Sequence, residues 1–179
     1  TTSLVAYAII FRSLFANDGL VNYVLVNLGI LDKPYNFLTQ PFAAKMVIIL
    51  ALLWRWTGYN MVFFLSGLQN IEYSVYEAAK IDGASAIQTF FKITVPLLKP
   101  TILLTAIMST NGTLQLFDES VNLTDGGPAN ASISMSHYIY NLCFKYVPNF
   151  GYAAAMSFFI LLLVAVLAFI QMRVGDKRD

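Results

Sequence analysis

An uninterrupted apolar run near the C-terminus constrains the fold more than any other feature of this sequence. Residues 152–172 contain no charged side chain. As a helix rising 1.5 Å per residue, this run would be roughly 31 Å long, which matches the hydrocarbon thickness of a lipid bilayer. We therefore predict that it forms a transmembrane helix.

The composition of the whole chain supports a membrane environment. Hydrophobic residues make up 58% of the 179 residues and charged residues only 12%, whereas soluble domains carry about 25% charged residues. A chain of this length cannot bury so much apolar side chain in its own core, so lipid must cover the excess. We predict an all-α, polytopic transmembrane helical bundle. Because the chain begins at Thr1 without a methionine, we interpret residues 1–179 as one transmembrane domain that lacks its N-terminal part.

Other apolar segments differ in length and polarity. Residues 46–68 are long enough to span, and residues 97–117 form a second apolar segment with a polar second half. Residues 3–16 are too short and suggest the tail of a truncated span. Residues 20–28 show helical spacing of apolar side chains, with Asn22 and Asn27 on other faces, which predicts a short amphipathic helix at the membrane surface. Residues 131–146 suggest a mixed interfacial helix.

The longest polar stretch, residues 72–100, lies between the two middle apolar segments. Ser74 and Glu77 have capping-box spacing, which predicts a helix from Val75. Gly83 predicts the end of that helix, because glycine adopts a left-handed conformation at little cost.

A second helix is predicted within the same stretch. Ser85 and Gln88 repeat the capping-box spacing, and Pro96 limits how far the helix extends.

The charges of the connecting segments predict the orientation. Six basic residues lie in the polar stretch and the C-terminal tail, and three lie in the other connections. The six are Lys80, Lys92, Lys99, Arg173, Lys177 and Arg178, and the three are Lys33, Lys45 and Lys145. Because cytoplasmic loops are enriched in lysine and arginine, we predict that the polar stretch and the C-terminus face the cytoplasm of a multi-pass membrane protein.

Polar residues within the apolar segments mark candidate positions on a transport path. One patch comprises Gly58, Tyr59 and Asn60, and a second comprises Ser109, Asn111, Thr113 and Gln115. Amides, hydroxyls and aromatic faces bind sugars, and transporters place substrate sites near the bilayer midplane. The same side chains also join helices to one another by hydrogen bonds, and that alternative stays open. Arg55 has two interpretations as well, a structural partner for another helix or a substrate contact.

Several features argue against other classes of function. A net charge of +1 argues against a nucleic-acid partner. No phosphate-binding G-x-x-x-x-G-K-[ST] sequence is present, so we expect this chain to bind no ATP, Mg²⁺ or other cofactor itself. No metal ligands are predicted. No catalytic residues are predicted either, because the adjacent carboxylates of Asp118 and Glu119 would not face each other on a helix and so could not act as an acid pair. The single histidine, His137, is interpreted as an interfacial residue, and the single cysteine is Cys143.

The polar stretch resembles the EAA loop of permease subunits of binding-protein-dependent ABC importers. The resemblance rests on Glu77-Ala78-Ala79, on Gly83 and on the segment from Ile93 to Pro96, in the pattern E-A-A-x3-G-x9-I-x-L-P with Val95 in place of leucine. Residues 56–61, 67–69, 117–119, 123–128, 138–140 and 150–152 are also similar to carbohydrate-uptake permeases related to the maltose transporter.

The resemblance implies how such a chain would work. It implies that residues 72–100 dock as a coupling helix into a cytoplasmic ABC ATPase, which would bind ATP and Mg²⁺. The docking residues would be Glu77, Ala78, Ala79, Asp82 and Gly83. Further expected partners are a second homologous permease in a heterodimer, an extracellular or periplasmic sugar-binding protein and the lipid bilayer of the cell membrane.

The function predicted on this basis is a permease subunit of an ATP-driven sugar importer, with oligosaccharides as the favoured substrate. An importer of peptides, amino acids or phosphate is the first alternative, because such permeases share the EAA loop. A membrane-embedded enzyme or a channel is the second, and we expect the chain to be a transport subunit without enzymatic activity.

Overall fold

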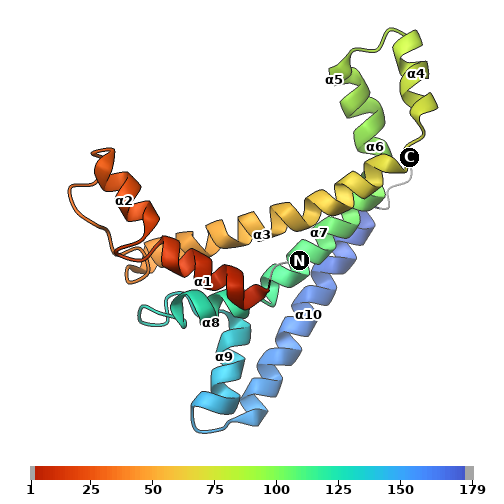
Figure 1. Cartoon of the computed structure of the whole chain (residues 1–179). Coiled ribbons are helices and arrows are strands. Elements are labelled where there is room, and N and C mark those ends of the chain that lie inside the picture. The colour runs from red at the N-terminus through yellow and green to blue at the C-terminus, as the bar shows by residue number, and fades with distance from the viewer. Residues whose placement is uncertain (1–2, 176–179) are drawn as a thin grey trace. The chain divides into compact units, whose positions relative to one another are not determined.

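The computed structural model describes residues 3–175, and this part of the chain contains helices and no strands. The α-helices are α1 (Leu4–Leu14), α2 (Leu20–Asn27), α3 (Pro41–Gln69), α4 (Tyr73–Ile81), α5 (Ala86–Thr89), α6 (Val95–Leu97), α7 (Lys99–Leu114), α8 (Asp118–Thr124), α9 (Met135–Tyr140) and α10 (Phe150–Gly175). Two π-helical turns, η1 (Phe90–Thr94) and η2 (Asn141–Lys145), follow α5 and α9 directly. The all-α prediction is confirmed (Figure 1).

Two helices are long and apolar enough to cross a membrane. They are α3, with 29 residues, and α10, with 26 residues. A third candidate is the pair formed by residues 86–97 and α7, which bends by 66° at its break. Most of the large apolar side chains of α10 are exposed, Phe158 by 60% for example, as expected of a surface that lipid covers. The predicted spans at residues 46–68 and 152–172 are both confirmed as helices.

The described residues form two compact units, which are considered separately. The first unit contains residues 3–55 and 113–162, and the second contains residues 56–112 and 163–175. In the first unit, α1 packs against α8 around the buried side chains Tyr7, Ala8, Ile48, Ala51 and Leu123. The second unit includes the polar stretch, in which α4 and the run from α5 to α6 form two neighbouring arms (Figure 1).

The first arm of the polar stretch differs from its prediction at its start. The Ser74–Glu77 capping box is wrong, because α4 begins at Tyr73 with Glu72 as its N-cap. Ser74 lies inside the first turn, where its hydroxyl donates to the Glu72 carboxylate at 3.3 Å. The predicted end is confirmed, since α4 stops at Ile81 and Gly83 has a φ of 75°.

The second arm follows its prediction closely. The Gln88 backbone N–H donates to Ser85 Oγ at 3.3 Å, and the Ser85 N–H donates to Gln88 Oε1 at 2.9 Å, so the second capping box is confirmed. The helical path ends at Leu97, one residue after Pro96, and the chain bends before α7. Proline removes a backbone donor at this point, which is consistent with the bend.

The segment from α2 to α3 contains a buried polar residue that the sequence did not predict. Leu20, Tyr23 and Val24 of α2 are exposed by 59%, 68% and 42%, as expected of an apolar face that lies on lipid, whereas Asn22 is buried. The Asn22 amide donates to the carbonyls of Ala16 and Tyr35, and its oxygen accepts from the Tyr35 N–H. Asn22 therefore holds the loop that follows α2 against the helix by hydrogen bonds to its backbone at Tyr35. The polarity of Asn22 alone did not indicate this role.

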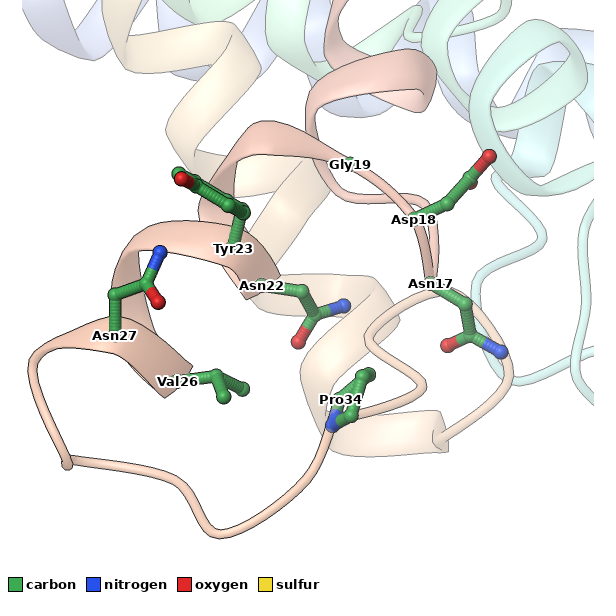
Figure 2. A pocket seen from close by; sticks show the side chains of 8 residues that line it. All are labelled: Asn17, Asp18, Gly19, Asn22, Tyr23, Val26, Asn27 and Pro34. Carbon is green, nitrogen blue, oxygen red and sulfur yellow. The ribbon is translucent and has the colours of Figure 1, made fainter.

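A small hollow lies beside Asn22. Its volume is about 230 Å³, and Figure 2 shows the eight residues that line it, from Asn17 to Pro34. The Asn22 side chain in the middle of this view is the one that fastens the loop.

His137 also differs from its sequence interpretation. It was expected to be an interfacial residue, but it is completely buried between α8 and α9 of the first unit. Its Nδ1 lies 2.8 Å from Ser120 Oγ. The predicted single helix at residues 131–146 is shorter, because α9 begins at Met135 and continues as the π-helical turn η2.

Candidate functional site

The two arms of the polar stretch, α4 and the run from α5 to α6, form a hairpin over residues 73–97, named the α4–α5 hairpin here. This hairpin carries the residues predicted to couple to an ATPase. Glu77, Ala78, Asp82 and Gly83 are exposed on it, whereas Ala79 is buried with 5% exposure. The two arms are joined by a hydrogen bond of 3.2 Å between Tyr76 Oη and Thr94 Oγ1. Ala78 can therefore contact a partner directly, whereas Ala79 packs inside the hairpin.

Large apolar side chains lie near Glu77 on the α4–α5 hairpin, and they were not predicted as site residues. Ile81 is one helical turn after Glu77 and is 85% exposed, and Ile87 at the start of α5 is 72% exposed. Tyr73 at the start of α4 is 75% exposed. A charged group beside large exposed apolar side chains is typical of a protein-binding surface. The position of Ile81 within a polar stretch was the one signal that could have identified it.

Polar residues of the two predicted patches meet within the second unit. The Asn60 amide donates to Ser109 Oγ at 3.2 Å, and the Ser109 hydroxyl lies 3.3 Å from Asn60 Oδ1. Tyr59 Oη lies 4.0 Å from the Met108 sulfur, and the Tyr59 ring contacts Trp56 edge to face at 5.4 Å. Hydrogen bonding between helices, the structural alternative, is thus observed for Asn60 and Ser109. The same cluster combines an amide, two hydroxyls and two aromatic rings in an apolar surrounding.

The other residues predicted for the transport path do not join the cluster of Tyr59, Asn60 and Ser109. Gly58 faces open space, since no atom of the described residues lies within 4 Å of the position that a Cβ would occupy. Asn111 is exposed in the second unit. Thr113 and Gln115 are exposed and belong to the first unit.

Arg55 forms an ion pair with the buried carboxylate of Glu119 in the first unit. Its guanidinium donates to Glu119 Oε1 at 2.5 Å, and the Tyr7 hydroxyl donates to the same oxygen. The side chain of Glu119 is 1% exposed and that of Arg55 is 30% exposed. Of the two interpretations of Arg55, the structure therefore supports a partnership with a carboxylate of another helix, one that links α1, α3 and α8.

A close contact between α3 and α7 gives the first testable prediction. A Cβ at Gly112 would lie 2.3 Å from the Trp56 ring, which no side chain can accommodate without a shift. We expect Gly112→Ala to destabilise the α3–α7 contact by about 1 to 3 kcal/mol. Gly58→Ala is the matched control, because it adds the same methyl group into open space. Thermal unfolding in detergent measures both, and equal effects of the two variants would contradict the packing described here.

Comparison with known proteins adds the decisive observation. Residues 2–178 match the family described as binding-protein-dependent transport system inner membrane component. The chain belongs to this family. The family consists of membrane components of transport systems, which agrees with the prediction of a transport subunit and not an enzyme, and with a location in a membrane.

Relatives of this inner-membrane component are named as sugar permeases. The lactose transport system permease protein LacF of Rhizobium radiobacter is 55% identical over 99% of the chain and 60% of its own length. The trehalose/maltose transport system permease protein MalF of Thermococcus litoralis is 37% identical over 89% of the chain and 53% of its own length. The arabinooligosaccharides transport system permease protein AraP of Bacillus subtilis is 34% identical over 98% of the chain and 56% of its own length. The chain thus spans about half to three fifths of the length of these relatives.

A solved structure shows the same fold. The crystal structure of a bacterial ABC transporter involved in the import of the acidic polysaccharide alginate aligns with a TM-score of 0.85 and 24% identity. The alignment covers 99% of this chain and 62% of that one. The predicted resemblance to permeases of carbohydrate uptake is confirmed by these comparisons. The individual site residues remain predictions, and no group of three or more metal-binding side chains occurs among residues 3–175.

Proposed function

We propose that the chain is part of a permease subunit that carries sugars, most favourably oligosaccharides, across the membrane in an ATP-driven importer. The observation that carries this proposal is the cluster of Tyr59, Asn60 and Ser109 between two apolar helices. A sugar hydroxyl both donates and accepts, so it can replace either partner of the Asn60–Ser109 hydrogen bonds at little net cost. Each ring of the cluster offers an apolar face for a sugar ring to stack on.

The names of the relatives support sugars over the alternative substrates. Relatives at 34 to 55% identity are named as permeases for lactose, trehalose or maltose, and arabinooligosaccharides. The predicted path also combines neutral amides and hydroxyls, which suit an uncharged substrate better than phosphate or an amino acid. Gly58 and Asn111, of the same unit, extend the proposed path, and Thr113 and Gln115, of the other unit, remain sequence predictions for it.

The proposed partners follow from the same arrangement. A cytoplasmic ABC ATPase that holds ATP and Mg²⁺ would receive the α4–α5 hairpin, with Glu77, Ala78, Asp82 and Gly83 on the contact surface. Movement of this hairpin would switch the path between outward and inward access. A second homologous permease would complete the membrane domain, and an external sugar-binding protein would deliver substrate. A further similar crystal structure, that of a bacterial alginate ABC transporter in complex with an alginate pentasaccharide-bound periplasmic protein, supports the last of these partners.

The proposed orientation places the hairpin in the cytoplasm. It rests on four basic residues, namely Lys80 on α4, Lys92 in η1, Lys99 at the start of α7 and Arg173 near the end of α10. Lys177 and Arg178, which contributed to the sequence prediction, lie outside the described residues.

Substrate uptake by intact cells tests the proposed substrate class. A strain deleted for this subunit should lose uptake of labelled oligosaccharides and keep uptake of labelled peptides, amino acids and phosphate. Restoring the full-length subunit should restore oligosaccharide uptake. Unchanged oligosaccharide uptake in the deletion strain would refute the sugar proposal, and loss of peptide or phosphate uptake would favour the alternative.

A further inference from the structure

A buried histidine with one unsatisfied nitrogen lies in the first unit, between the two spans at α7 and α10 in the sequence. His137 is completely buried, and its Nε2 has no hydrogen-bond partner among residues 3–175. The residue belongs to neither predicted patch, so the transport path does not explain it. A buried polar atom of this kind costs free energy and calls for a physical reason.

The hydrogen bonds of Ser120 determine which imidazole nitrogen carries the proton. The Ser120 hydroxyl donates its single proton to the Ser132 carbonyl at 2.8 Å, and its oxygen accepts from the Ser134 N–H at 3.2 Å. Toward His137 Nδ1, at 2.8 Å, Ser120 Oγ is therefore an acceptor. Neutral His137 must then carry its proton on Nδ1, which leaves a bare lone pair on the buried Nε2.

The group that faces this lone pair is a carboxylate. Asp125 Oδ1 lies 3.8 Å from His137 Nε2, and the same oxygen accepts from Lys145 Nζ at 2.8 Å. Two acceptors cannot bond to each other, so neutral His137 gains nothing from Asp125. A proton on Nε2 would turn the imidazole into a donor and bring it into competition with Lys145 for Asp125.

The ring of His137 also supports the tight turn that follows α8. Gly126 has a φ of 77°, and a Cβ at this position would lie 3.2 Å from the His137 ring. The Gly126 N–H donates to the Ser120 carbonyl at 2.9 Å, and the Gly126 carbonyl accepts from the Ser132 N–H at 3.2 Å. Any displacement of the imidazole therefore acts on the backbone of this turn.

We propose that His137 is a positioning residue for the turn at residues 125–128 and a pH-sensitive device, whose protonation loosens the contact between α8 and α9. The proposed function adds one consequence to this inference, because an external binding protein would meet this turn if the proposed orientation is right. Acidification outside the cell would then weaken binding-protein-dependent uptake.

The charges around the site set the direction of the effect. Burial lowers the pKa of His137, the positive charge of Lys145 lowers it further, and Asp125 opposes both. The pKa of Asp125 is lowered mainly by the hydrogen bond from Lys145, with a smaller contribution from the charge of Arg12 on α1. The folded site therefore binds a proton less readily than the unfolded chain does. Its stability is complete above about pH 6.5 and is lost as the pH falls from there through the lower pKa of the folded state.

Hydrogen exchange of the complete transporter in detergent or nanodiscs tests the device. After correction for the intrinsic pH dependence of exchange, protection of the amides in residues 120–137 should fall by up to about tenfold per pH unit below about pH 6.5. His137→Gln keeps a donor for Ser120 and cannot titrate, so its protection should not depend on pH. Protection that is independent of pH in the unmodified protein would overturn the proposal.

Two surface variants keep the test valid if His137→Gln does not fold. Lys145→Gln and Asp125→Asn both remove the same exposed ion pair, with side chains that are 42% and 67% exposed. Loss of Lys145 lets Asp125 pair with protonated His137, so the loss of protection on acidification should shrink. Loss of Asp125 leaves the buried charge unpaired, so the loss should grow. Changes of the same sign in both variants would show that the ion pair is merely structural and would overturn the role of His137.

A measurement of saccharide uptake distinguishes failure of this inference from failure of the proposed function. If exchange behaves as expected but the transporter takes up no saccharide at any pH, the proposed function fails and the device stands. If saccharide uptake is normal at pH 7 while exchange shows no dependence on pH, the device fails and the proposed function stands.

Discussion

Glu119→Ala is expected to destabilise the folded chain by about 3 to 5 kcal/mol, because it removes a buried carboxylate that accepts hydrogen bonds from the half-buried Arg55 guanidinium and from Tyr7. Arg55 and Tyr7 both donate to Glu119 Oε1, and Glu119 is 1% exposed within the core of the first unit. The alanine variant loses both hydrogen bonds and opens a cavity in the core that contains Leu123 and Ala51. Thermal unfolding of the purified subunit in detergent should show a clearly lower midpoint or a failure to accumulate in the membrane.

Controls for this prediction are available in the same site. Asp118→Ala removes the adjacent carboxylate, which is only partly buried, and it should have a small effect. The double variant Arg55→Met with Glu119→Leu removes both charges together and should recover most of the lost stability, because apolar groups of similar size often replace buried ion pairs without penalty. A Glu119→Ala variant as stable as Asp118→Ala would contradict the structural role assigned to the pair.

Glu77→Lys is expected to lower ATP-driven uptake by at least about tenfold and to weaken co-purification with the ATPase. Glu77 is exposed on α4 beside Ala78 and Ile81, where a basic residue of a partner can approach its carboxylate. Losing one member of a desolvated charge pair costs roughly 2 to 5 kcal/mol, and the substitution adds repulsion between like charges.

Glu72→Lys is the matched control for the coupling surface. It reverses the same charge on an exposed residue, the N-cap of α4, which lies outside the predicted docking set. Uptake and co-purification should change little in this control. If both survive Glu77→Lys as well, the coupling role of the hairpin is wrong.

The features that the sequence predicted well depend on local chemistry. Hydropathy and length identified α3 and α10, and glycine and capping residues identified Gly83 as the end of α4 and Ser85 as the start of α5. Each of these depends on residues close together in the chain. The misplaced start of α4 is a small error of the same local kind, since the N-cap is Glu72, two residues before Ser74.

The features that the sequence missed depend on contacts between distant residues. No partner was predicted for Glu119, yet it is buried and pairs with Arg55, 64 residues away. His137 was interpreted as an interfacial residue and no partner was predicted for Asn22, yet both are buried and hydrogen-bond with polar groups of neighbouring segments. A polar residue gives no local sign of such a partner, so burial of this kind follows only from the fold.

The candidate transport path was predicted in part: the sequence identified its residues but not their contacts. Composition identified Asn60 and Ser109 as members of two patches, and the structure brings them together across 49 residues. The contact between Gly112 and Trp56, which sets how closely α3 and α7 approach, was not predicted, because any glycine in an apolar helix offers the same signal.

Accumulation of sugar in proteoliposomes tests the central claim most directly. The full-length subunit would be reconstituted with its partner permease and ATPase, and the sugar-binding protein and a labelled oligosaccharide would be supplied on the side opposite the ATPase, with ATP on the ATPase side. The account predicts accumulation that requires both ATP and the binding protein and that falls when Glu77→Lys replaces the unmodified subunit. Accumulation without ATP, or none of any oligosaccharide while a peptide or phosphate is taken up, would contradict it.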